Sequence, residues 1–414
     1  MIDPLILFRA LHLAATVFAC GTVAFVVLVA EPAAQTDDHV FVDGLSRRLN
    51  AMTWGALAMA AIAQACWLIL LSADIYGAPI LAVCLHGGVW TVLTDTRFGL
   101  ISAIRIGLAA VLAVLIHWPA TRLLQVFAAA GLIGLLAFVG HAGATPGTAG
   151  GIHLGSDAIH LLAAAGWLGG LPAFALVLAA ARADPARHGF AIAVTRRFSW
   201  LAAACVGALL ATGIVNAWNL LNGPRDLIAT DYGRLLLLKL GLFAAMLAIA
   251  AANRFHLTPR LPALGALRAL QRNSLAETGL GLGVLLFVGA LGTLSPSGHA
   301  HPTNAEVPPN AAFVHIHTGE AMAEVTIEPG HTGEANAHIR VLREDFSEYP
   351  AKSVELTLDA PGGGRISRAA AHLPDGTWIV NAIALAKPGV WTVRVVIPTV
   401  KGTVVLDSPI AIDK

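Results

Sequence analysis

HAGATPGTAGGIHLGSDAIH, residues 141–160, is the most informative part of the chain, because apolar segments long enough to cross a bilayer flank it on both sides. It places three histidines and one carboxylate at a membrane boundary, where such groups are costly unless they serve a function. In an ideal helix His153, Asp157 and His160 fall at positions i, i+4 and i+7, which is one face. His141 ends the preceding apolar segment and can return to that face through a glycine-rich loop.

Imidazole and carboxylate groups in this arrangement favour a transition metal, with Asp157 as a ligand or as the group that orients a ligating histidine. The alternative is a helix N-terminus capped by Ser156 or Asp157, with interfacial histidines that bind nothing. We interpret the stretch as a metal or haem site.

The composition indicates an integral membrane protein. Of 414 residues, 57% are hydrophobic and only 12% are charged, whereas a soluble domain carries about 25% charged residues. The formal net charge of +1 gives no reason to expect nucleic-acid binding. All four cysteines lie in apolar segments, which excludes a CxxC redox motif and a disulfide-stabilised tail.

Eight apolar runs are long enough to span a membrane, at about 5–30, 47–72, 98–117, 121–140, 157–181, 197–221, 233–253 and 273–294. A shorter apolar piece at about 78–93 is more typical of an interfacial or re-entrant helix. The first run is too long for the core of a cleavable signal peptide, so we expect a true first span. An even number of spans puts both termini on the same side.

Arginines distinguish the two sides of the predicted bundle. They concentrate in alternate connections, at Arg47, Arg48, Arg122, Arg182, Arg187, Arg196, Arg197, Arg254, Arg260, Arg268 and Arg272. The loop at 141–156 has no Lys or Arg. By the positive-inside rule the arginine-rich side is cytoplasmic. We therefore expect a multi-pass protein of a bacterial inner membrane with both termini, the loop at 141–156 and His12 on the periplasmic side.

Ionisable residues inside the predicted spans should face the bundle interior, because exposure to lipid is costly. We expect an outer metal site above a polar track through the membrane. The predicted metal ligands are His12, His141, His153, Asp157 and His160, and the predicted track consists of Lys239, Asn253 and Glu277. The alternative is that the charged groups tie helices together or reach the lipid headgroups.

The composition changes after about Leu294, which divides the chain into a membrane domain at 1–296, a proline-rich linker at 297–311 and a tail at 312–414. The tail contains about seven short alternating runs separated by Gly and Pro turns, a pattern typical of an antiparallel, immunoglobulin-like β-sandwich. His315 and His317 lie two apart on the first run, so both would point to one face and form half of a metal site.

Four motifs occur in order along the predicted spans. They are HLGSDAIHLLAAAGWLGGLP at 153–172, RFS at 197–199, YGRLLLLKL at 232–240 followed by ANR at 252–254, and RNSLAE at 272–277 followed by LGTLSP at 291–296. Together they resemble the CopD family of bacterial inner-membrane copper-resistance proteins. The tail, with HIHTGEAMAEVTIEPG at 315–330, is similar to the YtkA/FixH-like domain that follows CopD in fusion proteins.

The resemblance implies a copper-handling protein that acts in copper transport, import or resistance, with a copper ion held by the outer His and Asp residues. Many members of the family begin with a CopC copper-binding domain, and this chain begins directly at the first span. We therefore expect a separate periplasmic CopC-like carrier as a partner, in addition to the membrane lipid.

Two other function classes stay open. The first is a haem-b-binding membrane redox protein, since histidines from different helices near one membrane face also hold b-type haems. His12 with His141, or His153 with His160, would be the axial ligands, although the second pair lies on one helix. The second is a membrane anchor whose β-sandwich binds a partner protein. Hydrolytic motifs are absent from the sequence, so we expect no enzyme unless the haem alternative holds.

Overall fold

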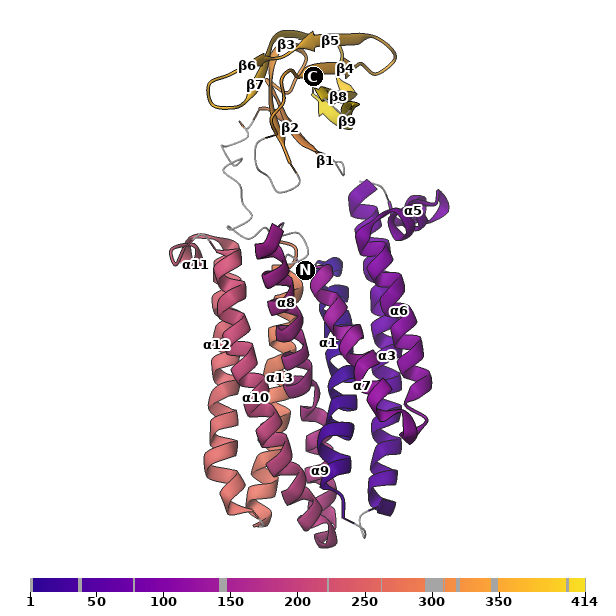
Figure 1. Cartoon of the computed structure of the whole chain (residues 1–414), viewed down its shortest axis with the longest axis vertical. Coiled ribbons are helices and arrows are strands. Elements are labelled where there is room, and N and C mark those ends of the chain that lie inside the picture. The colour runs from indigo at the N-terminus through magenta and orange to yellow at the C-terminus, as the bar shows by residue number, and fades with distance from the viewer. Residues whose placement is uncertain are drawn as a thin grey trace. The chain divides into compact units, whose positions relative to one another are not determined.

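The computed structural model describes residues 3–35, 39–76, 79–140, 147–221, 223–261, 263–294, 308, 310–317, 321–343, 349–399 and 402–413. The chain divides into two compact units, Met1–His299 and Ala300–Lys414. The first unit is helical and the second consists of β-strands (Figure 1). The expected fold class, a polytopic helix bundle followed by a small antiparallel β domain, is confirmed.

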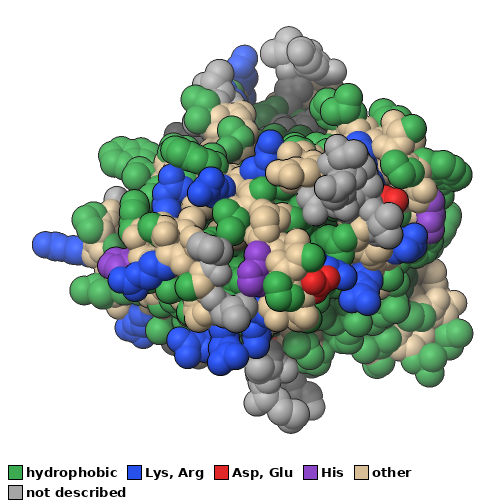
Figure 2. All heavy atoms as spheres, turned by 90° about the horizontal axis from the view of Figure 1, so that it is seen from below, with side chains coloured by type: hydrophobic (Ala, Val, Ile, Leu, Met, Phe, Trp, Pro, Cys, Tyr) green, Lys and Arg blue, Asp and Glu red, His purple; other side chains and the backbone are tan. Residues whose placement is uncertain are grey.

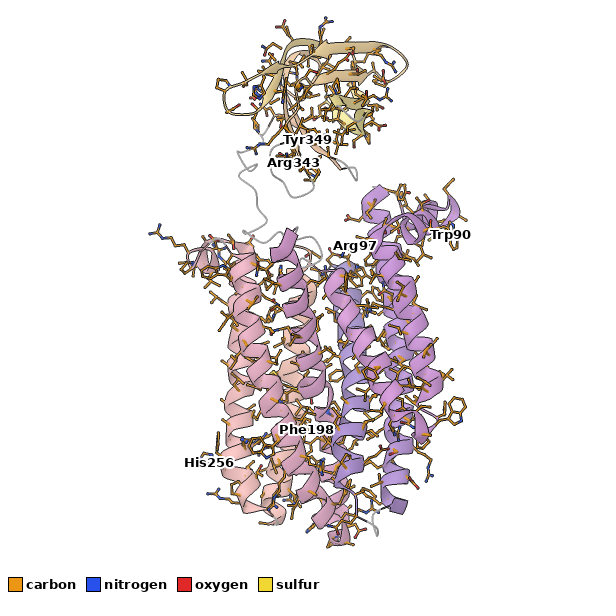
Figure 3. The ribbon with its side chains drawn as sticks, viewed as in Figure 1. Trp90, Arg97, Phe198, His256, Arg343 and Tyr349 are labelled. Atoms are coloured by element: carbon orange, nitrogen blue, oxygen red, sulfur yellow. The ribbon has the colours of Figure 1, made fainter. Side chains whose placement is uncertain are left out.

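Eight helical segments among the described residues are long and apolar enough to cross a membrane, as expected. The helices of the bundle are α1 (Pro4–Phe25), α2 (Glu31–Ala33), α3 (His39–Tyr76), α6 (Arg97–Leu115), α7 (Arg122–Gly134), α8 (Gly147–Ala164), α9 (Leu171–Ala183), α10 (His188–Leu220), α12 (Asp231–Ala252) and α13 (Leu264–Leu291). The short helices are α4 (Ile80–Leu85), α5 (Gly88–Asp95) and α11 (Asp226–Ala229). Helices α4 and α5 account for the expected short piece, and Trp90 of α5 points away from the bundle (Figure 3).

The fifth span differs from its predicted boundaries. It begins with α8 at Gly147, ten residues earlier than expected, passes through the π-helical turn Ala165–Gly169 and continues as α9. The prediction placed a loop here because glycine disfavours helix, but α8 packs along α10 and α7, and packing stabilises a helix more than propensity does. Pro172, in the first turn of α9, accompanies the interruption.

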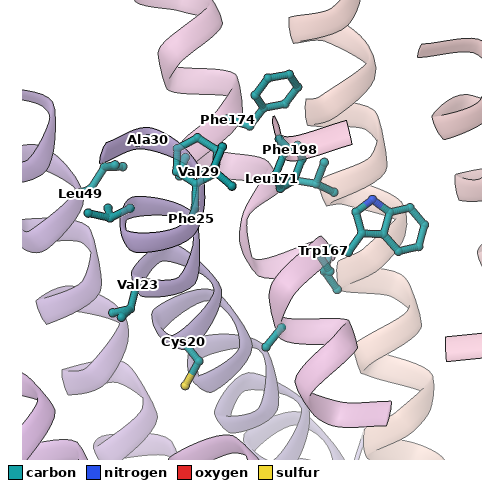
Figure 4. Close-up of a cluster of buried hydrophobic side chains, with 14 of the residues drawn as sticks. Cys20, Val23, Phe25, Val29, Ala30, Leu49, Trp167, Leu171, Phe174 and Phe198 are labelled. Carbon is teal, nitrogen blue, oxygen red and sulfur yellow. The ribbon is translucent and has the colours of Figure 1, made fainter. Parts of the chain in front are cut away.

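Helix α1 is the centre of the bundle. It packs against α3, α7, α13 and the π-helical turn of the fifth span. At its crossing with that turn, a Cβ atom on either Gly21 or Gly169 would collide with the backbone of the other segment. Figure 4 shows the buried cluster beside this crossing, where the rings of Phe25 and Phe198 lie 5.6 Å apart in a T-shaped contact. Small residues thus bring the two backbones together, as is common between membrane helices.

The surface of α10 fits a membrane-spanning helix. Trp200 and Trp218 are 70% and 84% exposed, and they lie eighteen positions apart on the helix, about 27 Å, which is close to the thickness of a bilayer core. Tryptophans at this spacing are typical of the two membrane interfaces. Figure 2 shows that Lys and Arg side chains gather at the end of the bundle opposite the N-terminus, with few acidic ones among them.

The second unit contains two antiparallel sheets, with strand orders β1-β2-β3-β7-β6 and β5-β4-β8-β9. The strands are β1 (Ala312–His317), β2 (Met322–Glu328), β3 (Gly333–Leu342), β4 (Glu355–Asp359), β5 (Arg365–Ala369), β6 (Ala371–His372), β7 (Trp378–Leu385), β8 (Gly389–Thr399) and β9 (Gly402–Ile412). The seven expected runs all form strands. Strands β5 and β6 were missed because they are mostly exposed and lack an apolar alternation.

We expect Gly169→Leu and Gly21→Leu to lower the stability of the helical unit by about 1–3 kcal/mol or more, because each side chain would meet backbone atoms that cannot rotate away. Thermal unfolding of the detergent-purified protein measures the effect. Gly207→Leu is the control, because a Cβ at Gly207 of α10 has no atom within 4 Å. If Gly169→Leu and Gly207→Leu melt at the same temperature, the close crossing is not required for the fold.

Candidate functional site

A group of polar side chains connects α8 to α10 inside the membrane spans. Asn216 donates a hydrogen bond from Nδ2 to Asp157 Oδ1 at 3.2 Å, and His160 Nδ1 lies 2.9 Å from Thr212 Oγ1. Ser156 donates from its hydroxyl to the Thr212 carbonyl oxygen at 3.2 Å. These three contacts place the polar face of α8 against α10.

A cation from a third helix approaches this group. Lys239 of α12 interacts electrostatically with both Asp157 and His160, and Tyr232 on the same helix is close enough to interact with Asp157. Asp157 and Lys239 are not among the ion pairs within 4.0 Å in the described residues, so the Lys239 ammonium acts on the Asp157 carboxylate across a longer distance. We call Asp157, His160, Thr212, Asn216 and Lys239 the α8 cluster. It joins two predicted metal ligands, Asp157 and His160, to Lys239, which was predicted to belong to the polar track.

The α8 cluster has two features that bear on ligand binding. Asn216 Oδ1 is buried and has no hydrogen-bond partner, although buried acceptors are normally satisfied. A Cβ atom on Gly140 would lie 3.8 Å from Asp157 Oδ2, so the carboxylate is next to the end of the fourth span. His141 follows directly in the sequence but lies outside the described residues. His153 is buried on α8, one turn before Asp157.

His12 lies in a different environment. It is 4% exposed, its Nδ1 lies 2.8 Å from the Ala60 carbonyl oxygen, and its ring is 5.8 Å from that of Trp67. It lines a cavity of about 220 Å³ whose walls come from α1, α3, α6 and α7, with no residue from α8. The structure therefore groups Asp157 with His160, and it places His12 with α3 and α6.

The two other track residues form a separate pair near the opposite end of the bundle. Asn253 donates from Nδ2 to Glu277 Oε1 at 3.1 Å, and Glu277 is 2% exposed. Both line a cavity of about 340 Å³ between α9, α10, α12 and α13, together with Phe198, which Figure 3 shows inside the bundle. No His, Cys or Met is among the residues that line this cavity.

In the β unit, His315 of β1 is paired in register with Glu324 of β2, and His315 Nδ1 lies 3.5 Å from Glu324 Oε1. Arg340 of β3 is the next residue in this row. The backbone of His317 is in β1, but its side chain is not among those described. His338 lies on β3, two strands from His315, so the two histidines do not converge on one point.

Among the described residues, no group of three or more His, Cys, Asp or Glu side chains is close enough to hold a metal ion. The α8 cluster supplies one imidazole and one carboxylate, and a further ligand would have to come from His141, His153 or a rearrangement. Asp157, His160 and Lys239 were predicted from the sequence, whereas Thr212 and Asn216 were not. Thr212 and Asn216 lie four residues apart on one helix, and this spacing is the signal that would have paired their helix with α8.

Comparison with known proteins gives two family models that match most of the helical unit. The model "Copper resistance protein D-like, N-terminal domain" matches residues 1–151, and "Copper resistance protein D" matches residues 192–291. A Pseudomonas syringae pv. tomato protein named copper resistance protein D is 32% identical over 223 residues, which are 50% of this chain and 72% of that protein. The chain belongs to the copper resistance protein D family. The family prediction is thereby confirmed.

For two other relatives, the match to this chain covers less than two thirds of the relative's length. Inner membrane protein YebZ of Escherichia coli (strain K12) is 40% identical over 176 residues, which are 42% of this chain and 59% of that protein. Copper transport protein CutJ of Bacillus subtilis (strain 168) is 32% identical over 229 residues, 55% of this chain and 39% of that protein. No solved structure matches the chain.

The pairing of Asp157 with Lys239 can be measured by a double-mutant cycle with Asp157→Asn and Lys239→Met. Each single change removes one of two opposite charges that attract each other inside the membrane unit, so we expect the double variant to be more stable, by about 1–3 kcal/mol, than the two single effects added together. Unfolding in detergent reports the coupling free energy. The exposed Asp231–Arg234 pair on the same helix should couple by only about 0.3–0.5 kcal/mol. Equal coupling in the two pairs would refute a buried electrostatic interaction between Asp157 and Lys239.

Proposed function

We propose that this protein binds a copper ion at the α8 cluster and passes it into the membrane domain, in copper transport or copper resistance. The single observation that carries the proposal is the group of Asp157, His160, Asn216 and Lys239 inside membrane spans. Imidazole and carboxylate ligands suit copper, and the further ligands we propose are His153, four residues before Asp157 on α8, and His141, which follows the fourth span in the sequence. The names of the family and of its relatives support copper as the ion.

Lys239 gives the proposed site a way to respond to the ion. Without copper, its ammonium group balances the Asp157 carboxylate. A copper ion that binds Asp157 and His160 would be repelled by this ammonium, so Lys239 must turn away or release a proton when the ion enters. The unpartnered Oδ1 of Asn216 is free to act as an additional oxygen ligand.

We further propose that the site faces the periplasm. Arginine-rich connections lie at the opposite end of the bundle, which by the positive-inside rule is cytoplasmic, and the family relationship supports a bacterial inner membrane. Copper would reach the site from a CopC-like carrier, with the β unit and its His315 and His317 as a second contact for the ion. A pull-down with copper-loaded periplasm that recovers no copper-binding protein would contradict the carrier.

The route beyond the cluster follows α12. Lys239, Met246 and Asn253 are spaced by seven residues, so they share one face of the helix at intervals of about 10 Å. Met246 is 2% exposed, and its thioether is a soft ligand midway between the cluster and the Asn253–Glu277 pair. The inner cavity lacks His, Cys and Met, so we assign Glu277 to charge balance and not to copper ligation.

The decisive measurement is the metal content and visible spectrum of the detergent-purified protein, wild type beside the His153→Ala/His160→Ala double variant. We expect about one copper ion per chain, lost in the double variant. His256→Ala is the matched control, because His256 lies at the opposite end of the bundle (Figure 3). Copper that stays bound in the double variant would exclude the α8 cluster, and a Soret band that disappears with it would establish the haem alternative.

The route is tested separately with Met246→Leu, which conserves volume and removes the sulfur. We expect this variant to bind copper at the α8 cluster as wild type does, but to pass it more slowly in a proteoliposome flux assay. Unchanged copper flux would exclude Met246 from the route and leave the binding site intact.

A further inference from the structure

The cavity around His12 contains an imidazole nitrogen that nothing in the proposed copper site uses. The Ala60 carbonyl oxygen can only accept a hydrogen bond, so His12 Nδ1 must carry the proton, and Nε2 is left with a lone pair. His12 Nε2 is buried and has no hydrogen-bond partner. Because an unsatisfied buried acceptor is unfavourable, the free nitrogen indicates a ligand that donates a hydrogen bond here.

Beside His12 lies a cation that lacks an acidic partner. Arg105 is 2% exposed and donates to the Leu132 carbonyl oxygen at 3.1 Å and to Gln64 Oε1 at 3.3 Å. Its contact to Thr16 Oγ1 is long, at 3.5 Å, and none of the ion pairs among the described residues involves it. A metal cation would be repelled here, whereas a neutral ligand with an acceptor oxygen would be favoured.

The remaining walls of the cavity are apolar and open toward lipid. Ile106 and Ala110 of α6 and Ala58 and Ala61 of α3 are exposed on the bundle surface, yet they line the same cavity. Along α3 the lining runs from Gln64 to Trp54, ten residues or about 15 Å. The cavity is therefore a groove with a polar floor and an apolar length, open on its membrane side.

The depth of the polar floor restricts the ligand class. His12 and Arg105 both lie eight residues, or about 12 Å, from the starts of α1 and α6 at the N-terminal end of the bundle. A phospholipid headgroup stays at the membrane interface, because burying its charges is costly. A fatty acid is ionised beside the Arg105 guanidinium, and its carboxylate then has no proton for His12 Nε2. A hydroquinone has two hydroxyl groups, each able to donate and to accept, on a small neutral ring that carries an apolar tail.

We propose that this groove binds a membrane-soluble hydroquinone. One hydroxyl group donates to His12 Nε2, its oxygen accepts from Arg105, and the tail lies along the alanine-lined groove between α3 and α6. The oxidised quinone offers only carbonyl acceptors, which would face the lone pair of His12, so the site selects the reduced form. This site is separate from the α8 cluster and does not depend on copper binding.

The test is equilibrium binding of decylubiquinol and decylubiquinone to the purified full chain in lipid nanodiscs. We expect the reduced form to bind at least about tenfold more tightly, since the oxidised form leaves the buried nitrogen unsatisfied. His12→Phe should abolish this preference and weaken quinol binding about tenfold. His86→Ala is the matched control and should bind as wild type does, because His86 is an exposed residue directly after α4.

Because His12→Phe also removes the bond to Ala60, a second variant tests the groove without touching its polar floor. Ala110→Phe places a ring in the groove from the lipid-exposed side and should block the tail while the protein keeps its melting temperature. Equal binding of the two redox forms to wild type, or quinol binding that survives Ala110→Phe, would overturn the proposal. A Soret band in the wild type that is lost in His12→Phe would also overturn the proposal, because His12 Nε2 would then ligate a haem iron.

Discussion

The crossing of α1 with the interrupted fifth span is the constraint on which the arrangement of polar groups depends. In a membrane the hydrophobic effect does not hold helices together, so close packing has to do so. Gly21 and Gly169 allow the two backbones to touch, and the π-helical turn Ala165–Gly169 widens the helix at this point. The first half of the bundle then meets the second along α1, and each half keeps its own set of buried polar residues.

The two sets of buried polar residues differ in the groups around their cation. This difference favours a different kind of ligand in each set. In the α8 cluster the cation is Lys239, which interacts electrostatically with an acidic group, Asp157, and with the imidazole of His160. In the His12 groove the cation is Arg105, which cannot lose its proton, and the neighbouring polar groups are neutral. A copper ion that enters near Asp157 therefore has no electrostatic reason to reach His12, although both lie in the same membrane unit.

The sequence was sufficient for the fold class and for the helical face of α8, and insufficient for the pairing of helices. Apolar length identifies a span, and the spacing of His153, Asp157 and His160 identifies one face, because both follow from helix geometry. The position of His12 along the first span could also be predicted from the sequence. That position does not show which neighbouring helix the side chain contacts. That is decided by the crossing at Gly21, which turns the opposite face of α1, with His12, toward Ala60 of α3.

The tail shows the same limit in a sheet. Alternation located seven strands correctly, because their inward residues form the core, for example Val325, Ile339 and Val393. It could not show that Arg340 lies in the same row as His315 and Glu324, since cross-strand register is not visible along one strand. This row thus places an arginine next to the acidic partner of His315, so a histidine pair read from one strand is a weaker ligand set than its spacing suggests. In both units the spacing along one helix or strand identifies the candidate side chains. The charged groups on the neighbouring helix or strand then determine which ligand those side chains can bind.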